Sequence, residues 1–345
     1  MIKKSVLIFS AILSIFSFFS CEQEVNEGYS DELLRLQAYM KLHYPNVEPT
    51  ESGLYYIILE QGDGSTPQEG DFLLFDYTGQ DLNDDVYETT NDSIADLYDI
   101  FSKSNHYAPK FIGYKSDRTP LLKGLDEGFA YIKEGSLARF VIPSPLAYGS
   151  KTYKSLNPYT TIIIDIDFHK IVSDPEAYEI EQISDYIALN YPDLDPDQVI
   201  NSLSEDGVYI LEETLNEVEA DEEEEEATDP HQTIEEDDVI SVDYTGKFLD
   251  HWIFDTSIKA VAEENGTYQS NKTYEPINVT IGGTDYIEGF SLALKKLKTN
   301  SSAKVIILSE FAYGPYGSDN IQPYTPLIFE LEVFAKTSSN NAETK

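Results

Sequence analysis

The stretch Asp76-Tyr77-Thr78-Gly79 returns 167 positions later as Asp243-Tyr244-Thr245-Gly246. An Ala-Tyr-Gly triplet and a Pro-Tyr-Thr triplet also return, each 165 positions later. Ordered motifs with preserved spacing indicate a chain built from two copies of one unit. A length of 345 residues agrees with this, because a domain typically has roughly 150 residues. The triplets stand at 147–149 and 312–314, and at 158–160 and 323–325.

Each copy contains the same kinds of predicted elements. A helical stretch leads in, at 33–44 in the first copy and at 183–191 in the second. Short runs of β-branched and aromatic residues then predict strands, with one short helix between them. Several antiparallel strands around one helix predict an α+β fold. The two domains are placed at 31–173 and 174–337. The predicted strands lie at 72–78, 138–142, 161–168, 239–245, 303–308 and 327–334, and the short helices at 125–132 and 290–297.

Composition excludes several classes of protein. The chain has 23 Lys and Arg against 63 Asp and Glu, a formal net charge of −40. Nucleic-acid binding needs clustered basic residues, so no nucleic-acid partner is expected. A single cysteine excludes an internal disulfide framework and a cysteine-based zinc site. Hydrophobic residues make up 41% of the chain, enough for packed cores.

The N-terminal sequence predicts where in the cell the protein is located. Lys3 and Lys4 precede an apolar stretch at 6–19, which is too short to span a bilayer but fits a secretory signal. Cys21 follows directly and resembles the acylated cysteine of bacterial, Bacteroidetes-like lipoproteins. We therefore expect a signal peptide at 1–20, lipid on Cys21 and a tether at 21–30. This places the protein in the cell envelope, anchored by lipid to the outer membrane, on its periplasmic face or at the cell surface. The alternative is an incidental cysteine.

Four further segments interrupt or end the repeat. Residues 89–108 and 256–275 are polar, turn-rich stretches at corresponding positions, and we expect loops there. The second copy also holds an acidic insert at 217–238, with an unbroken acidic run at 221–226. Such a run is expected to stay solvated, and it lacks the spacing of a calcium loop. Residues 338–345 form a polar tail.

The ordered motifs of both copies resemble the FKBP family of peptidylprolyl isomerases. The second copy shows them best, with Tyr-Thr-Gly at 244–246, Phe-Asp at 254–255, Ile-Glu-Gly-Phe at 287–290 and Ala-Tyr-Gly at 312–314. The first copy shows Tyr-Thr-Gly at 77–79, and Ala-Tyr-Gly at 147–149. The resemblance implies two domains, each an antiparallel sheet wrapped on a short helix and each preceded by a helical lead-in. It also implies an apolar pocket between sheet and helix that receives a proline side chain.

Position by position, the resemblance implies a catalytic pocket in the second copy. Four aromatic residues would form its wall and floor. One backbone N–H and one tyrosine hydroxyl would face the ligand amide, and a carboxylate would stand at the rim. A bulky aliphatic residue would sit on a covering loop. In that order the residues are Tyr244, Phe254, Phe290 and Phe329, then Ile287, Tyr313, Asp255 and Ile321.

The first copy departs from this pattern and implies only a possible second pocket. Tyr87-Glu88 replaces Phe254-Asp255, and two aromatic positions become aliphatic. We expect this copy to be weakly active or inactive and to serve as a binding or spacing module. The residues concerned are Tyr77, Tyr87, Glu88, Leu122, Leu125, Tyr148, Leu156 and Ile164.

An apolar pocket of this kind needs no metal ion, cofactor or nucleophile, and none is expected. Amide rotation is eased when water is excluded and the less polar, twisted amide is favoured. The sequence thus predicts a lipid-anchored prolyl isomerase that acts on proline-containing segments or unfolded exported proteins, with activity mainly in the second copy. Two alternatives stay open: a non-catalytic FKBP-fold chaperone, and a surface lipoprotein that uses the fold as a binding scaffold.

Overall fold

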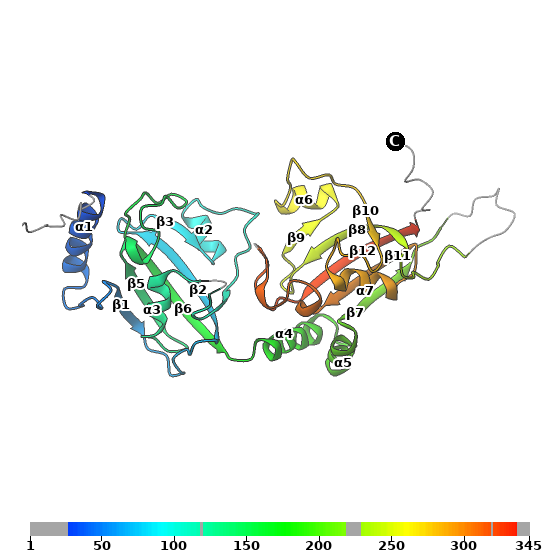
Figure 1. The fold of residues 1–345 in the computed structure, drawn as a ribbon, viewed down its shortest axis with the longest axis horizontal. Helices are drawn as coiled ribbons and strands as arrows, with labels where there is room; N and C mark the ends of the chain where they lie inside the picture. The colour runs from blue at the N-terminus through cyan, green and yellow to red at the C-terminus, as the bar shows by residue number, and fades with distance from the viewer. Residues whose placement is uncertain (1–26, 118–119, 219–228, 319, 337–345) are drawn as a thin grey trace, which may run out of the picture.

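The computed structural model describes residues 27–117, 120–218, 229–318 and 320–336. Two antiparallel sheets, each packed on a short helix, lie side by side along the molecule (Figure 1). This confirms the predicted α+β fold and its repetition. The predicted signal peptide, Cys21 and the polar tail lie outside the described residues, as does the acidic run. Within the described ranges, no helix is long and apolar enough to cross a membrane.

The first domain forms a six-stranded sheet in the order β1-β5-β6-β2-β3, with β4 also paired to β2. Its lead-in helix α1 begins inside the predicted tether. The elements are α1 (Glu27–His43), β1 (Tyr55–Glu60), β2 (Phe72–Asp81), β3 (Val86–Thr89), α2 (Asp92–Leu97), β4 (Lys110–Gly113), α3 (Lys123–Phe129), β5 (Leu137–Ile142), η1 (Ser144–Leu146) and β6 (Ile162–Val172).

The second domain repeats this plan in the order β10-β8-β12-β11-β7, with β9 also paired to β8. The elements are α4 (Pro175–Asn190), α5 (Pro196–Asp206), β7 (Val208–Leu215), β8 (Val239–Lys247), β9 (Ile253–Thr256), α6 (Lys259–Asn265), β10 (Ile277–Thr280), α7 (Glu288–Lys296), β11 (Ser301–Ile307), η2 (Ser309–Phe311), η3 (Gly314–Tyr316) and β12 (Leu327–Lys336).

Each short helix packs so closely on its sheet that a glycine is required at the contact. A Cβ on Gly124 of α3 would lie 2.4 Å from Cγ2 of Ile142. A Cβ on Gly289 of α7 would lie 2.3 Å from Cγ2 of Ile307. Such distances are far below van der Waals contact, so a larger residue would push helix and strand apart. The glycine recurs in both copies because the same packing recurs.

Local capping signals explain the helices between the two domains. Asp174 accepts a hydrogen bond of 3.0 Å from the N–H of Ala177 and is followed by proline, which suits the first turn of α4. Asp195 caps α5 in the same way, and Gly207 ends that helix with a φ of 74°. The predicted lead-in at 183–191 is therefore the second half of α4, and α5 is an additional helix.

The two polar inserts are not entirely loops. The segment 89–108 contains α2, whose N-terminus is capped by the side chain of Asn91 through a 2.9 Å hydrogen bond from the N–H of Ile94. The segment 256–275 contains α6, which ends at Gly266 with a φ of 74°. Both helices are about two turns long, and so their hydrophobic periodicity was too short to detect.

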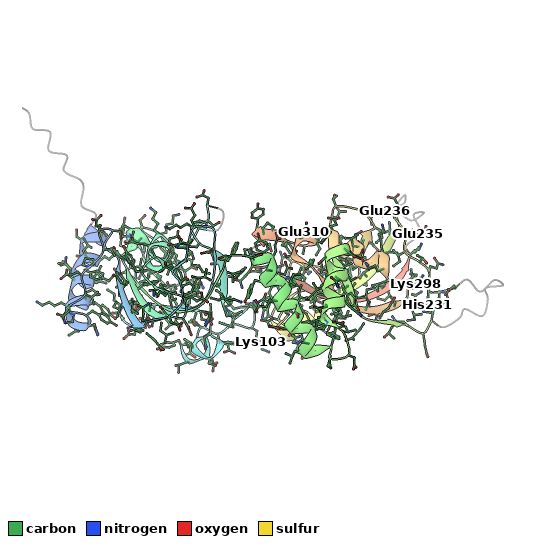
Figure 2. The ribbon with its side chains drawn as sticks, turned by 90° about the horizontal axis from the view of Figure 1, so that it is seen from below. Lys103, His231, Glu235, Glu236, Lys298 and Glu310 are labelled. Atoms are coloured by element: carbon green, nitrogen blue, oxygen red, sulfur yellow. The ribbon has the colours of Figure 1, made fainter. Side chains whose placement is uncertain are left out.

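The described part of the acidic insert is held to the second domain by lysines. The Lys298 ammonium donates to Oγ1 of Thr233 at 2.7 Å, and the Lys295 ammonium lies 2.7 Å from a carboxylate oxygen of Glu236. Figure 2 shows His231, Glu235, Glu236 and Lys298 together at the end of the molecule farthest from α1. The described part of the insert therefore lies on the side of the second domain away from the first domain.

A junction of polar and aromatic contacts joins the two domains. Nε2 of His106 lies 2.5 Å from a carboxylate oxygen of Asp250, and the His106 ring stacks on Trp252 with centroids 4.9 Å apart. The ring of Tyr324 meets the ring of Phe72 edge-on at 5.4 Å. Lys103, labelled near the junction in Figure 2, donates a long hydrogen bond of 3.5 Å to the carbonyl of Glu264.

A buried glutamate in each lead-in helix holds the short helix that precedes the Ala-Tyr-Gly motif. In the first domain, Glu32 accepts hydrogen bonds from the N–H and hydroxyl of Ser144 at 2.6 and 2.5 Å. In the second, Glu179 accepts from the N–H and hydroxyl of Ser309 at 2.7 and 2.6 Å. Burial raises the pKa of Glu179 to about 7, although the Ser309 hydrogen bonds oppose this shift. The sequence analysis missed this pair because the partners are 130 residues apart.

The raised pKa of Glu179 predicts that the second domain loses stability as the pH rises. Between the ordinary glutamate pKa of 4.5 and about 7, the folded state holds a proton that the unfolded state has lost, so the free energy of unfolding falls across this window. At ~1.4 kcal/mol per pKa unit the loss is about 3 kcal/mol. The substitution Glu179→Gln is expected to flatten this dependence, because an amide keeps both contacts with Ser309 and does not ionise.

Denaturant unfolding followed by fluorescence of Trp252, the one tryptophan of the chain, measures this at pH 5 and pH 8. Glu205→Gln, at an exposed site on α5, is the matched control and should leave the pH dependence unchanged. An equal pH dependence in wild type and Glu179→Gln would contradict the prediction.

Candidate functional site

Four aromatic rings from four elements converge in the second domain. Tyr244 comes from β8, Phe254 from β9, Phe290 from α7 and Phe329 from β12. The Phe329 ring meets the rings of Phe290, Phe254 and Tyr244 with centroid distances of 5.1, 5.8 and 6.2 Å. The first two contacts are edge-to-face, the arrangement that aromatic quadrupoles favour. Sequence analysis assigned all four rings to one pocket, and the structure brings them together.

Phe329 and Phe290 form the base of this cluster, with only 5% and 3% of their surfaces exposed. Tyr244 and Phe254 are half-buried. Phe254 lies directly over the strand glycine Gly246, where a Cβ would come within 2.5 Å of its ring. The Tyr-Thr-Gly motif therefore ends in glycine because the neighbouring strand places an aromatic ring on that spot.

A depression of about 560 Å³ opens beside these rings. Its lining includes four of the predicted residues and places Lys272 and Ser318 next to them. Tyr313 is 38% exposed here, so its hydroxyl is accessible to a ligand. Burial, and then the charge of Asp255, raise the pKa of Tyr313, and its hydroxyl therefore stays protonated and able to donate. The predicted lining residues are Phe254, Asp255, Tyr313 and Ile321.

The predicted rim carboxylate is fixed by two donors. The hydroxyl of Tyr244 donates to Asp255 at 2.6 Å, and the ammonium of Lys272 forms an ion pair with the same carboxylate. Burial, followed by Asp255, raises the pKa of Tyr244, which keeps its hydroxyl a donor. Lys272 was missed because it lies in the insert at 256–275, where neither strand nor helix pattern indicated its position.

The remaining predicted residue, Ile287, stands at the N-terminus of α7. Its backbone is extended, with φ −59° and ψ 144°, so its N–H lies outside the hydrogen-bond ladder of the helix. Leu122 stands at the equivalent place before α3, with φ −55° and ψ 140°. Ile287 is not among the residues that line the depression, and the role of its N–H toward a ligand stays a prediction.

The eight predicted residues of the first domain also come together, and the ring of Tyr153 packs among them. Tyr148 stacks on Tyr153 with ring centroids 4.0 Å apart, and Tyr87 meets Tyr153 edge-on at 6.1 Å. Four of the predicted residues are buried and the others are half-buried around them. The buried ones are Tyr87, Leu125, Leu156 and Ile164, and the half-buried ones are Tyr77, Glu88, Leu122 and Tyr148.

Tyr153 closes the first pocket and also binds its rim carboxylate. Its hydroxyl donates to Glu88 at 2.8 Å, while Tyr77 donates to the other oxygen and Lys154 lies 2.9 Å away. Burial alone would raise the pKa of Glu88, but these three partners outweigh it and lower the pKa. The carboxylate is thus ionised and fully engaged. Tyr153 was missed, although the 165-residue repeat pairs it with the smaller Ser318.

The described residues contain no group of three or more His, Cys, Asp or Glu side chains placed to hold a metal ion. The chemistry available in the second domain is that of an apolar aromatic surface, a protonated tyrosine hydroxyl and a carboxylate fixed at the rim. Such a surface can bind an apolar ring and hydrogen-bond a neighbouring amide.

The chain is similar to proteins of one known family. A family model described as FKBP-type peptidyl-prolyl cis-trans isomerase matches residues 64–169 and again residues 231–334. The probable FKBP-type peptidyl-prolyl cis-trans isomerase FkpA of Neisseria meningitidis serogroup B is 30% identical over 132 residues, which cover 38% of this chain and 42% of that protein. The peptidyl-prolyl cis-trans isomerase FKBP9 of Mus musculus is 24% identical over 275 residues, 79% of this chain and 36% of that protein.

This chain therefore spans less than half the length of either relative. Among solved structures, FkpA from Escherichia coli matches 43% of this chain and 63% of its own at 20% identity and a TM-score of 0.34. The three FKBP domains of wheat FKBP73 match 85% of this chain and 99% of theirs at 16% identity and a TM-score of 0.29.

Substitutions at the equivalent positions 153 and 318 should change which domain can bind a ligand. Ser318→Tyr is expected to fill the second pocket and weaken binding of a proline-containing peptide at least about tenfold. Tyr153→Ser is expected to open the first pocket and add a second binding event. Isothermal titration calorimetry reports both the affinity and the number of sites. Ser318→Ala is the control for loss of the hydroxyl, and unchanged stoichiometry in Tyr153→Ser would contradict the assignment.

Proposed function

We propose, from the premise that this chain belongs to the family of FKBP-type peptidyl-prolyl cis-trans isomerases, that its second domain isomerises X-Pro bonds. The premise rests on two matches to the family model that together cover more than half of the chain. The observation that carries the proposal is the cluster of four aromatic rings beside the open depression. Tyr313 and Asp255, two residues to which the family resemblance assigns roles, line that depression and support the proposal.

Rotation about an X-Pro amide faces a barrier of about 18–20 kcal/mol because resonance makes the planar form polar. Water stabilises the planar form, so an apolar surface that excludes water favours the twisted form. Phe254 and the ring cluster behind it supply that surface, and the Tyr313 hydroxyl supplies a donor for the amide. Each ~1.4 kcal/mol removed from the barrier accelerates the reaction tenfold. A pocket without nucleophile or metal is therefore sufficient for this reaction.

The first domain is proposed to have little or no activity. Tyr153 occupies the space that Ser318 leaves open in the second domain, and Glu88 already has three partners. This supports the sequence-based expectation of a binding or spacing module, and it gives a physical reason for it.

A soluble form, residues 22–345, contains every described element and allows the activity to be measured. The double variant Tyr313→Phe, Asp255→Val removes the donor and the rim charge. It is expected to lower kcat/KM for an X-Pro peptide at least about tenfold, the equivalent of one ~1.4 kcal/mol contact. The matched control is Tyr148→Phe, Glu88→Val in the first domain, which should stay within about twofold of wild type.

Equal losses in the two double variants would show that the second domain is not the main site. Binding of the peptide and of an unfolded protein without any acceleration in wild type would replace the isomerase with a non-catalytic chaperone. Refolding of a proline-limited protein provides the second substrate, because its slow phase takes tens of seconds.

The proposed setting is the cell envelope, with lipid on Cys21 as the anchor and unfolded exported proteins as substrates. Support comes from the N-terminal sequence: Lys3 and Lys4, the apolar stretch at 6–19 and the position of Cys21. The body of the protein is strongly acidic and would be repelled by anionic headgroups, so lipid rather than protein surface would hold it.

Expression of the full chain in a Gram-negative bacterium with a labelled fatty acid tests the anchor. Wild type is expected to take up the label and sediment with the outer membrane, because acyl chains insert into the bilayer. Cys21→Ala should lose both properties, whereas Ser20→Ala should retain them. Label on the Cys21→Ala variant would refute lipidation at this residue.

A further inference from the structure

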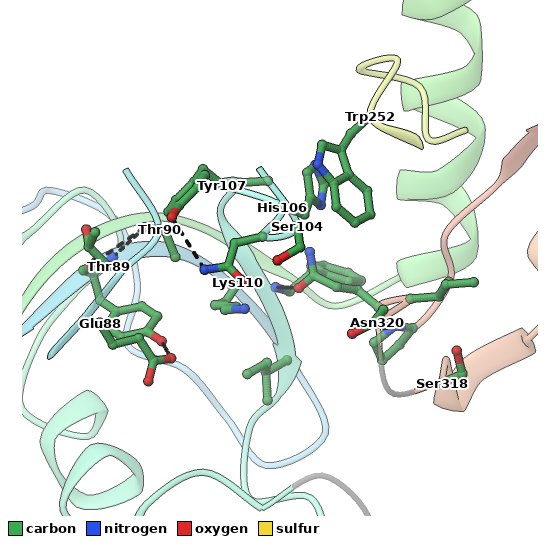
Figure 3. Close-up of a pocket in the computed structure, with 18 of the residues that line it drawn as sticks. Glu88, Thr89, Thr90, Ser104, His106, Tyr107, Lys110, Trp252, Ser318 and Asn320 are labelled. Carbon is green, nitrogen blue, oxygen red and sulfur yellow. Dashed lines mark hydrogen bonds between the residues drawn. The ribbon is translucent and has the colours of Figure 1, made fainter. Parts of the chain in front are cut away.

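A groove of about 370 Å³ lies between the two domains. The first domain supplies residues 104–108 and 110–112, among others. The second domain supplies Trp252 and Tyr316, together with Ile321 and the residues on either side of it. Figure 3 shows Glu88 and Lys110 on one side of this space, and Ser318 and Asn320 on the other. The groove therefore exists only where the two domains meet.

The groove is continuous with the depression of the second domain. Ser318, Asn320 and Ile321 line both. On the opposite side the groove reaches Tyr77 and Glu88, at the rim of the closed first pocket. The groove is therefore within reach of a polypeptide whose proline occupies the depression.

Paired hydrogen bonds hold the two walls of the groove in place. Strand β4 pairs with β2 only, among the described strands, so its other edge is free for a new partner. The Gln322 side chain fills that edge: its Oε1 accepts from the N–H of Phe111 at 2.6 Å, and its Nε2 donates to the carbonyl of Pro109 at 3.0 Å. Gln322 directly follows Ile321, so the segment that borders the depression is tied to the first domain. A preformed groove loses less entropy when it binds an extended chain.

Lys110 gives the groove a donor without a partner. Among the described residues its ammonium forms no hydrogen bond or ion pair, and burial lowers its pKa. Glu88, the carboxylate whose charge acts on Lys110, is already engaged by Tyr77, Tyr153 and Lys154. Peptide carbonyls are acceptors that such a half-buried ammonium can bind without a counter-charge.

Aromatic side chains supply the remaining surface. Tyr107 and Trp252 are half-buried, and Tyr316 is 54% exposed. These rings offer apolar contact together with polar edges, a combination that suits extended polypeptide. An anionic ligand is disfavoured because the chain carries a net charge of −40.

We propose that this groove is a second substrate subsite: it binds the extended polypeptide segment that flanks the isomerised proline. Lys110 donates to carbonyls of that segment, and Tyr107, Trp252 and Tyr316 contact its apolar side chains. The inference rests on the proposed function, and it assigns the first domain a role in gripping substrate without a pocket of its own.

Two variants of residues 22–345 test the subsite with substrates of two lengths. A peptide of about 12 residues spans ~40 Å when extended and can occupy both depression and groove, whereas a tetrapeptide occupies the depression alone. Lys110→Met and Tyr316→Ala are each expected to raise KM for the long peptide about fivefold, the loss expected for one hydrogen bond or contact. The value of kcat should not change, because the groove binds substrate and transition state equally. KM for the tetrapeptide should stay within about twofold.

Lys41→Met, on the exposed face of α1 at the far end of the first domain, controls for the loss of one positive charge. Equal changes for both peptides, or no change for either, would overturn the subsite. Displacement of the long peptide by millimolar inorganic phosphate in wild type but not in Lys110→Met would reassign the groove to an anion.

The subsite and the proposed function fail in different ways. If wild type turns over neither peptide, the isomerase proposal fails, and the groove is then tested by the dissociation constant of the long peptide from fluorescence anisotropy. A fivefold higher dissociation constant in Lys110→Met would support the subsite proposal. An unchanged dissociation constant would refute it. If the tetrapeptide is turned over and the long peptide has the same KM as the tetrapeptide, the subsite proposal fails and the isomerase proposal stands.

Discussion

In each domain an aromatic ring lies directly over a glycine of the neighbouring strand, Tyr87 over Gly79 and Phe254 over Gly246. A Cβ on either glycine would lie 2.6 or 2.5 Å from the ring above it, so any other residue would displace that ring. The ring in turn fixes the wall of the pocket, and the following residue becomes the rim carboxylate. In the second domain the same packing places Phe254 against Phe329, and thereby aligns the cluster that the candidate site is built on. The lack of a side chain at this glycine thus sets the geometry of the site.

The same scaffold presents different pockets in the two copies, and the pair Tyr153 and Ser318 is one source of the difference. Tyr153 stacks on Tyr148 and closes the first pocket, whereas Ser318 leaves Tyr313 accessible. The source of the cation at the rim also differs, since Lys154 comes from the segment after the Ala-Tyr-Gly motif and Lys272 comes from the insert. A duplicated fold therefore keeps its architecture while one copy loses an open pocket. Residues at the rim of the first pocket instead line the groove between the two domains.

Elements that lie outside the repeated sheet hold the site in place. Glu179 of the lead-in helix α4 anchors η2, and the next turn carries Tyr313. Gln322 ties the segment after it to the edge of β4 in the other domain. Both contacts use buried or half-buried polar groups that are fully paired. Such contacts fix the orientation of the segments they join and also stabilise them. The candidate site of the second domain is thus supported from its own lead-in helix and from the first domain.

The sequence by itself determined the two-fold repeat and the α+β class, because motif spacing and hydrophobic period carry this information directly. The identity of the aromatic set followed from the resemblance of the ordered motifs to the FKBP family. The cap signals around α5 were equally present in the sequence, but its short length concealed it. Only the tertiary structure decided which tyrosine fills a pocket, which lysine meets Asp255 and which glutamate is buried against Ser309. The last two pairs join residues that are 17 and 130 positions apart. Their contacts depend on how packed elements approach each other in space, which no local pattern records.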